Sequence, residues 1–156
     1  MVAAASRLKC EVKDLHIHFN GDARTFRRWK ENADKNPNEK STIKYSAFGL
    51  LTAIVHNEII FTEDKKPLDV ANAELWKLVA DNYVYKAGEF TPPNEKIVKM
   101  FYGKDSITGL YRLELASLLG YDKSHFGRLI VKMNFGTWAS LMLCLGVPVS
   151  QMFDIQ

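Results

Sequence analysis

Apolar residues recur at helical spacing along most of the chain, and this pattern predicts a mainly α-helical fold built from small bundles. Residues 45–55, YSAFGLLTAIV, are almost continuously apolar, which indicates a buried helix. Residues 68–79 carry apolar side chains on one helical face, at Leu68, Ala71, Leu75, Leu78 and Val79. We expect this second, amphipathic helix to pack the two halves of the chain together.

Prolines and polar residues interrupt the helical pattern at three places, namely residues 36–38, 62–67 and 91–94. These breaks predict three parts, which are an N-terminal helical part over 1–62, a linker with a connecting helix over 63–92, and a C-terminal helical domain over 93–156.

The C-terminal domain has the pattern of two consecutive helices, over about 109–119 and 123–133. Gly120 ends the first, since glycine readily takes the left-handed conformation that terminates a helix. Either Asp122 or Ser124 is expected to cap the second by accepting a backbone N–H. Two helices joined by a short turn that contains glycine form a helix-turn-helix unit.

Residues 112–131 read RLELASLLGYDKSHFGRLIV, with small Ala116 where two helices would cross and Gly120 in the turn. The apolar positions that would fix the angle between the helices are Leu115, Leu119, Tyr121, Phe126 and Leu129. This pattern resembles the helix-turn-helix of the Cro/repressor (XRE-like) family. Residues 138–153, WASLMLCLGVPVSQMF, are similar to the closing helices of that family, so the resemblance covers about 94–153.

The resemblance implies that this unit binds duplex DNA. Lys123, Ser124, Gly127 and Arg128 would face outward on the recognition helix, whose N-terminal residues reach base edges in the major groove. Arg112 would contact phosphate and set the register without reading sequence. The alternative is that Lys123 and Arg128 belong to an ordinary solvated helix face.

The segment 21–32, GDARTFRRWKEN, carries a fainter echo, because its Phe26 and Trp29 stand where Phe126 and Leu129 stand in the C-terminal unit. It resembles the recognition helix of phage cII-type activators. The resemblance implies that the side chains available to DNA are Arg24, Thr25, Arg27, Arg28 and Lys30, after a cap at Asp22. The alternative is a basic amphipathic helix that packs on the rest of the protein without being a repeat.

A second unit would give the chain two recognition helices, as an intramolecular pseudo-dimer. A symmetric pair of such helices reads half-sites about 34 Å apart. A conventional homodimer is the other possibility, in which the aromatic surface near Trp138 and Phe153 is an interface as readily as it is core.

The charge of the whole chain gives little support for a nucleic-acid partner, but the N-terminal region carries an excess of basic residues. The net charge is +3, but residues 1–40 hold nine Lys and Arg against six Asp and Glu. The chain shows neither a secretory leader nor a run of about 18 apolar residues, so we expect a cytoplasmic protein that makes no use of a membrane. Cys10 and Cys144 are far apart in sequence, and we expect no disulfide between them.

Catalytic, cofactor and metal motifs are missing from the sequence. No phosphate-binding glycine loop, nucleophile elbow or framed carboxylate pair occurs, so we expect neither an enzyme nor a bound cofactor. His16 and His18 would point the same way on a strand, beside Asp14, Cys10 or His56, but no ligands stand at a zinc spacing. We therefore expect no metal site.

The sequence thus favours a sequence-specific, double-stranded DNA-binding transcriptional regulator of phage or plasmid type. The alternative is a protein-binding inhibitor, such as an antitoxin, anti-CRISPR or anti-activator protein, that uses the same fold against a protein target. The salt dependence of binding separates the two, because phosphate contacts weaken steeply as salt rises.

Overall fold

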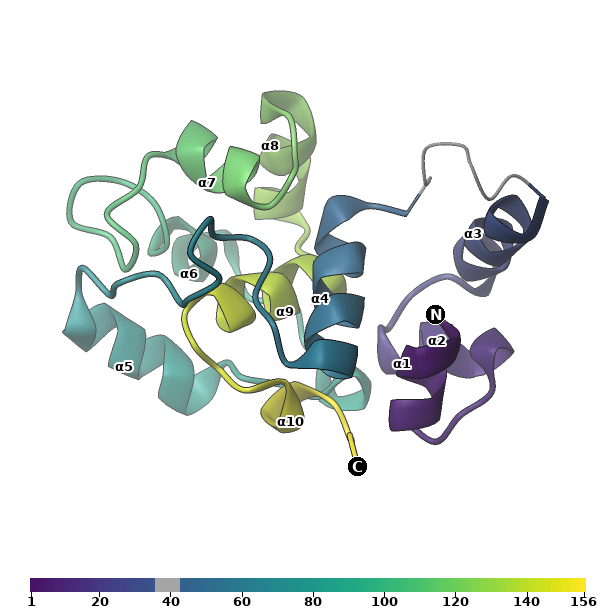
Figure 1. Ribbon diagram of the computed structural model, residues 1–156. Helices are drawn as coiled ribbons and strands as arrows, with labels where there is room; N and C mark the ends of the chain where they lie inside the picture. Colours follow the sequence, from purple (N-terminus) through teal and green to yellow (C-terminus); the bar gives the residue numbers. More distant parts are fainter. Residues whose placement is uncertain (36–42) are drawn as a thin grey trace.

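The computed structural model describes residues 1–35 and 43–156, and within these residues the protein is mainly helical and has no β-strand (Figure 1). The sequence break at 36–38 lies outside the described residues. The α-helices are α1 (Val2–Arg7), α2 (Leu15–His18), α3 (Ala23–Lys35), α4 (Tyr45–His56), α5 (Ala73–Asn82), α6 (Glu95–Lys99), α7 (Arg112–Leu118), α8 (Lys123–Val131), α9 (Phe135–Cys144) and α10 (Val149–Met152). Two 3₁₀ helices, η1 (Val12–Asp14) and η2 (Ala87–Glu89), complete them. None of these helices is long and apolar enough to cross a membrane.

Helix α9 forms the centre of the fold. Every residue of α9 except Gly136 is buried, and α4 packs along it. The hydroxyl of Ser140 donates to the carbonyl of Gly136 in its own helix and, at 3.3 Å, to the carbonyl of Ser46 in α4. These two apolar helices join the N-terminal and C-terminal parts of the chain, and the buried core runs without a break from Ala4 to Phe153.

The segment predicted as a linker, 63–92, is fastened to the C-terminal part by backbone hydrogen bonds. The Leu68 N–H donates to the Cys144 carbonyl at 2.7 Å, and the Ala71 N–H donates to the Ile107 carbonyl at 2.8 Å. Because these two donors are engaged outside any helix, Leu68 and Ala71 precede α5 instead of belonging to it.

Helix α5 does not join the two halves, contrary to the expectation from its apolar stripe. It begins after Asn72, whose side chain accepts the Leu75 N–H at 3.2 Å and so caps the helix. Val79 is its one buried residue, and Leu78 is exposed. The joining element is the α4–α9 pair.

Trp138 and Phe153 are core residues, which excludes them from an exposed interface. They are 1% and 2% exposed. The Trp138 indole N–H donates to the Tyr83 carbonyl at 2.7 Å, and its ring meets Phe101 edge to face. The buried indole therefore has its one polar atom satisfied.

His16 and His18 lie in helix α2, so the strand alternation that would have aligned them does not exist. His16 Nδ1 lies 2.8 Å from the Lys13 carbonyl oxygen. Over the residues that the structure describes, no group of three His, Cys, Asp or Glu side chains is placed to hold a metal ion.

Candidate nucleic-acid interface

Helices α7 and α8 are joined by a four-residue turn, 119–122, and we call this arrangement the C-terminal pair. Gly120 has φ +78°, in the left-handed region. The turn is closed by two backbone bonds, from the Gly120 N–H to the Ser117 carbonyl at 3.0 Å and from the Tyr121 N–H to the Ala116 carbonyl at 2.9 Å. A glycine ends α7 here as the sequence predicted.

The cap of α8 is Asp122, not Ser124. Its carboxylate accepts the His125 N–H at 2.8 Å, which satisfies one of the open donors at the start of the helix. Ser124 is therefore not the cap, and it is exposed in the first turn of α8.

The C-terminal pair is held by buried apolar side chains. Ala116 is buried where the two helices meet, and the apolar residues predicted to fix their arrangement are also buried, namely Leu115, Leu119, Phe126 and Leu129. Tyr121 is only half-buried, and its hydroxyl lies 2.7 Å from both the Ser46 and the Thr137 hydroxyls. The sequence pattern does not reveal this chain of hydroxyls, because its three members come from different parts of the chain.

The outward face of α8 carries Lys123, Ser124 and Arg128, all exposed. None of the ion pairs within the described residues involves Lys123 or Arg128. Among the described residues, these two cations have no ion-pair partner, and the other face of their helix is buried in the core. Helix α8 lies next to α7 in Figure 1.

Gly127 lies beneath the side chain of Arg112 instead of standing open to solvent. A β-carbon at position 127 would be 2.8 Å from Arg112 Nη2. The missing side chain thus makes room for the guanidinium of α7 to lie across α8, on the same exposed side as the rest of the pair.

The pKa of His125 is lowered by burial and in part by the positive charges near the start of α8. Burial lowers its pKa, and the nearby cations Lys44 and Arg128 lower it further, while Asp122 acts in the opposite direction. Lys44 immediately precedes α4, so a second element adds positive charge beside α8. Sequence reasoning did not find Lys44, since nothing in the spacing of the residues indicates that it lies near α8.

Helices η1 and α2, the turn 19–22 and helix α3 form a similar arrangement, which we call the N-terminal pair. As predicted, Asp22 accepts the Thr25 N–H at 2.9 Å. Phe26 and Trp29 are buried, also as predicted. Thr25 is only partly available to a ligand, because its hydroxyl also donates to Asp22 at 3.0 Å.

Four basic side chains of α3 are exposed, and they are Arg24, Arg27, Arg28 and Lys30. Lys30 pairs with Asp34 at 3.0 Å. Within the described residues no ion pair involves the three arginines. Arg27 and Arg28 are therefore exposed cations outside any ion pair of the described residues, whereas the pKa of Asp22 is lowered first by the hydrogen bonds from Thr25 and then, to a smaller extent, by the charge of the nearby Arg24.

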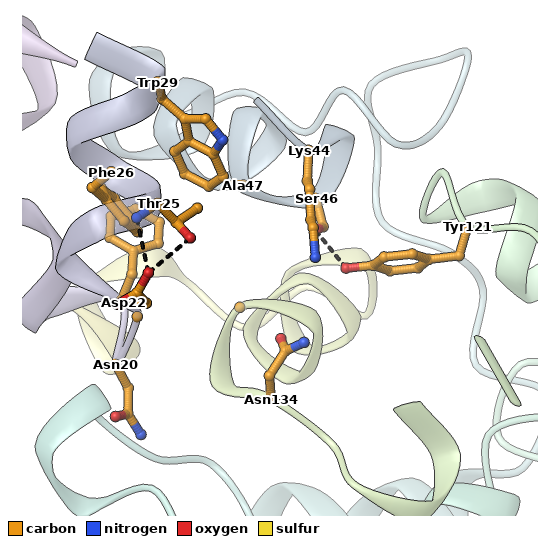
Figure 2. Close-up of a pocket in the computed structure, with 13 residues that line it drawn as sticks. Asn20, Asp22, Thr25, Phe26, Trp29, Lys44, Ser46, Ala47, Tyr121 and Asn134 are labelled. Carbon is orange, nitrogen blue, oxygen red and sulfur yellow. Dashed lines mark hydrogen bonds between the residues drawn. The ribbon is translucent and has the colours of Figure 1, made fainter. Parts of the chain in front are cut away.

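The two pairs face one another across a cleft of about 280 Å³ (Figure 2). Asp22 and Thr25 line one side of the cleft and Tyr121 lines the other, while Lys44 and Asn134 lie between them at the starts of α4 and α9. The structure therefore brings the turns of both pairs to one place, although they are about a hundred residues apart in sequence.

No family model matches the chain, and no curated protein or solved structure matches it either. The class that the fold defines is a mainly helical protein whose described residues contain two helix pairs, each with a capped turn between its helical segments.

Proposed function

We propose that this protein is a cytoplasmic regulator that binds duplex DNA sequence-specifically, with α8 as its reading helix. The observation that carries the proposal is the exposed face of α8, where Lys123 and Arg128 form no ion pair with any described residue and Ser124 stands beside them, on a helix fixed by buried residues. A helix of this kind fits the major groove, and its first turns reach base edges.

The side chains suit the two kinds of contact that such a complex needs. Arg128 and Lys123 donate to guanine O6 and N7, and the Ser124 hydroxyl donates to or accepts from a base or phosphate. Arg112, lying over Gly127, contributes a phosphate contact that sets the register of α8 on the duplex.

The surroundings of α8 favour an anion. Lys44 and Arg128 are close enough to His125 to lower its pKa, so positive charge is concentrated at the start of this helix. The backbone N–H groups of a helix N-terminus attract phosphate in the same direction. Asp122 opposes this effect, but its influence on the pKa of His125 is smaller than that of Lys44 or Arg128.

The test is fluorescence-anisotropy titration of a pooled random duplex, at about 50 and about 200 mM salt. We expect binding at low salt that weakens by a factor of ten or more at high salt, because several phosphates are contacted and each releases counter-ions. An absence of binding at both salt concentrations would contradict the proposal.

Arg128→Ala tests the assigned surface. Loss of a base-reading arginine is expected to cost about 1–3 kcal/mol and to reduce the preference for a selected site over random duplex. Lys77→Ala is the matched control, because it removes the same charge from α5, which lies away from α8 in Figure 1. Equal affinities of the two variants would show that α8 does not read the DNA.

A protein partner is the second candidate, favoured by a shallow groove between α4 and α7. Tyr45, Phe61, Leu113 and Leu118 line it, and Leu113 is 55% exposed. Leu113→Ser separates the two candidates. It leaves DNA affinity within about twofold if α8 is the functional surface, because residue 113 makes no contact assigned to DNA and the change adds no charge beside Arg112.

A further inference from the structure

The turns of the two helix pairs have the same hydrogen bonds at positions one hundred residues apart. In the N-terminal pair the Gly21 N–H donates to the His16 carbonyl at 2.8 Å, and the Asn20 N–H donates to the Ile17 carbonyl at 3.1 Å. In the C-terminal pair the same bonds join 121 to 116 at 2.9 Å and 120 to 117 at 3.0 Å.

The left-handed residue of each turn also falls at equivalent positions. Asn20 has φ +47° and Gly120 has φ +78°. Asparagine tolerates this conformation better than other residues with a β-carbon, so it substitutes for glycine here. Matching Gly21 with Gly120 by residue type, as the sequence invites, therefore gives the wrong register by one residue.

The helix that follows each turn starts in the same way. Asp22 accepts the N–H of Thr25, and Asp122 accepts the N–H of His125. The first main-chain bond of the helix then runs from Phe26 to Asp22 at 3.2 Å, and correspondingly from residue 126 to residue 122 at 3.0 Å.

Burial follows the same register. The four matched apolar positions, which are buried in both pairs, are Leu15 and Leu115, Phe19 and Leu119, Phe26 and Phe126, and Trp29 and Leu129. The first helical segment covers the same seven positions, as η1 and α2 over 12–18 and as α7 over 112–118. One difference is His16, which replaces the small Ala116 and is only half-buried.

The helix after each pair completes the correspondence, since α4 follows the N-terminal pair and α9 follows the C-terminal pair. These two helices pack against each other, which is the arrangement of an isologous interface between equivalent elements. The Ser140 hydroxyl donates to the second residue of each, Ser46 and Gly136. The residues just before them, Lys44 and Asn134, line the same cleft (Figure 2).

From these matches we infer that the two pairs are copies of one unit and that α3 is a second DNA-binding helix, so that a single chain engages one duplex through both α3 and α8. The inference rests on the proposed function. Arg24, Arg27 and Arg28 supply the charge on α3, as Lys123 and Arg128 do on α8. Because the two copies differ at these positions, the chain reads an asymmetric site without dimerising.

The test compares the wild-type chain with Arg27→Ala/Arg28→Ala on a 30-base-pair random duplex, in the same anisotropy assay. If both arginines contact phosphate, the slope of log K against log salt falls in magnitude by about 2, and affinity at low salt falls by about tenfold or more. Both side chains are exposed, so circular dichroism is expected to show an unchanged fold and melting temperature. Lys77→Ala/Lys86→Ala is the control, because it removes two charges that lie outside α3 and α8 and are paired with Asp81 and Asp154, and it is expected to leave the slope nearly unchanged.

Sedimentation of the complex, with the DNA labelled, gives the number of chains on one duplex at the lowest saturating concentration. One chain per duplex, together with the reduced slope, supports the inference. Two chains per duplex, or a double variant that binds like the wild type while Arg128→Ala is impaired, overturns it and leaves the proposed function standing. If the wild-type chain does not bind duplex DNA, both this inference and the proposed function are contradicted.

Discussion

The Arg112 guanidinium lies across α8 at Gly127, where Nη2 is 2.8 Å from the point that a β-carbon would occupy. Glycine within a helix costs about 1 kcal/mol relative to alanine, yet here it leaves the space that the arginine uses. Gly127 therefore lowers the stability of the helix but allows the Arg112 guanidinium to lie across it.

Gly127→Ala is expected to raise the free energy of unfolding by up to about 1 kcal/mol, because the new methyl displaces only the flexible end of Arg112. DNA affinity is expected to fall at the same time, since Arg112 no longer lies in place. Urea denaturation and anisotropy measure the two effects. A stabilised variant with unchanged DNA affinity would show that the position of Arg112 has no part in binding.

Gly120→Ala is expected to destabilise the protein by about 2–4 kcal/mol. Its φ of +78° disfavours a side chain, and a β-carbon would stand 2.6 Å from the β-carbon of Tyr45, which cannot swing away. Gly88→Ala is the matched control, because nothing lies within 4 Å of its added methyl and its φ is outside the left-handed region. Urea denaturation of both variants checks the difference, and similar midpoints would contradict the described turn.

Acid is expected to affect folding and DNA binding in opposite directions through His125. Its pKa in the folded protein is held below the unfolded value of about 6.5 by burial, Lys44 and Arg128. The unfolded chain therefore binds the proton first, and stability from this group, present above pH 6.5, is lost as pH falls. A phosphate bound beside α8 raises the same pKa, so DNA affinity increases over that range.

His125→Gln is expected to reduce both pH effects relative to the wild type. Thermal melting and anisotropy between pH 7.5 and pH 5.5 measure them. If DNA affinity at lower pH changes equally in the two proteins, His125 does not lie near the bound phosphate.

The two cysteines are expected to differ in reactivity. Burial raises the pKa of Cys144 to about 12, and it also raises that of the half-buried Cys10, whose thiol lies near Asp14. A thiol reagent at pH 8 should modify Cys10 slowly and leave Cys144 unmodified until the protein is unfolded. Rapid reaction of two thiols in the native protein would contradict the burial of α9.

Apolar periodicity and capping residues were sufficient to predict the helices in which they occur. The apolar run of α4 and the cap and glycine around α8 predicted those helices to within a few residues, because capping and periodicity act over a single turn. Burial of Phe26, Trp29 and Leu129 followed from the same periodicity.

Relationships between distant residues were not predictable in this way. Helix α5 begins later than its apolar stripe suggests, because Leu68 and Ala71 bond to distant carbonyls. The contribution of Lys44 to the charge around α8 depends on packing between segments far apart in sequence. Contacts of this kind cannot be predicted from the spacing of neighbouring residues in the sequence.

The most direct test of α8 as a DNA-reading helix is the amide NMR spectrum of the ¹⁵N-labelled chain, recorded before and after addition of a short duplex. The account predicts that the largest shifts fall on residues 123–128 and Arg112 and, if α3 binds the same duplex, on residues 24–30, and that amides of the groove around Leu113 change little. Shifts centred on that groove, or an unchanged spectrum at saturating duplex, would contradict it.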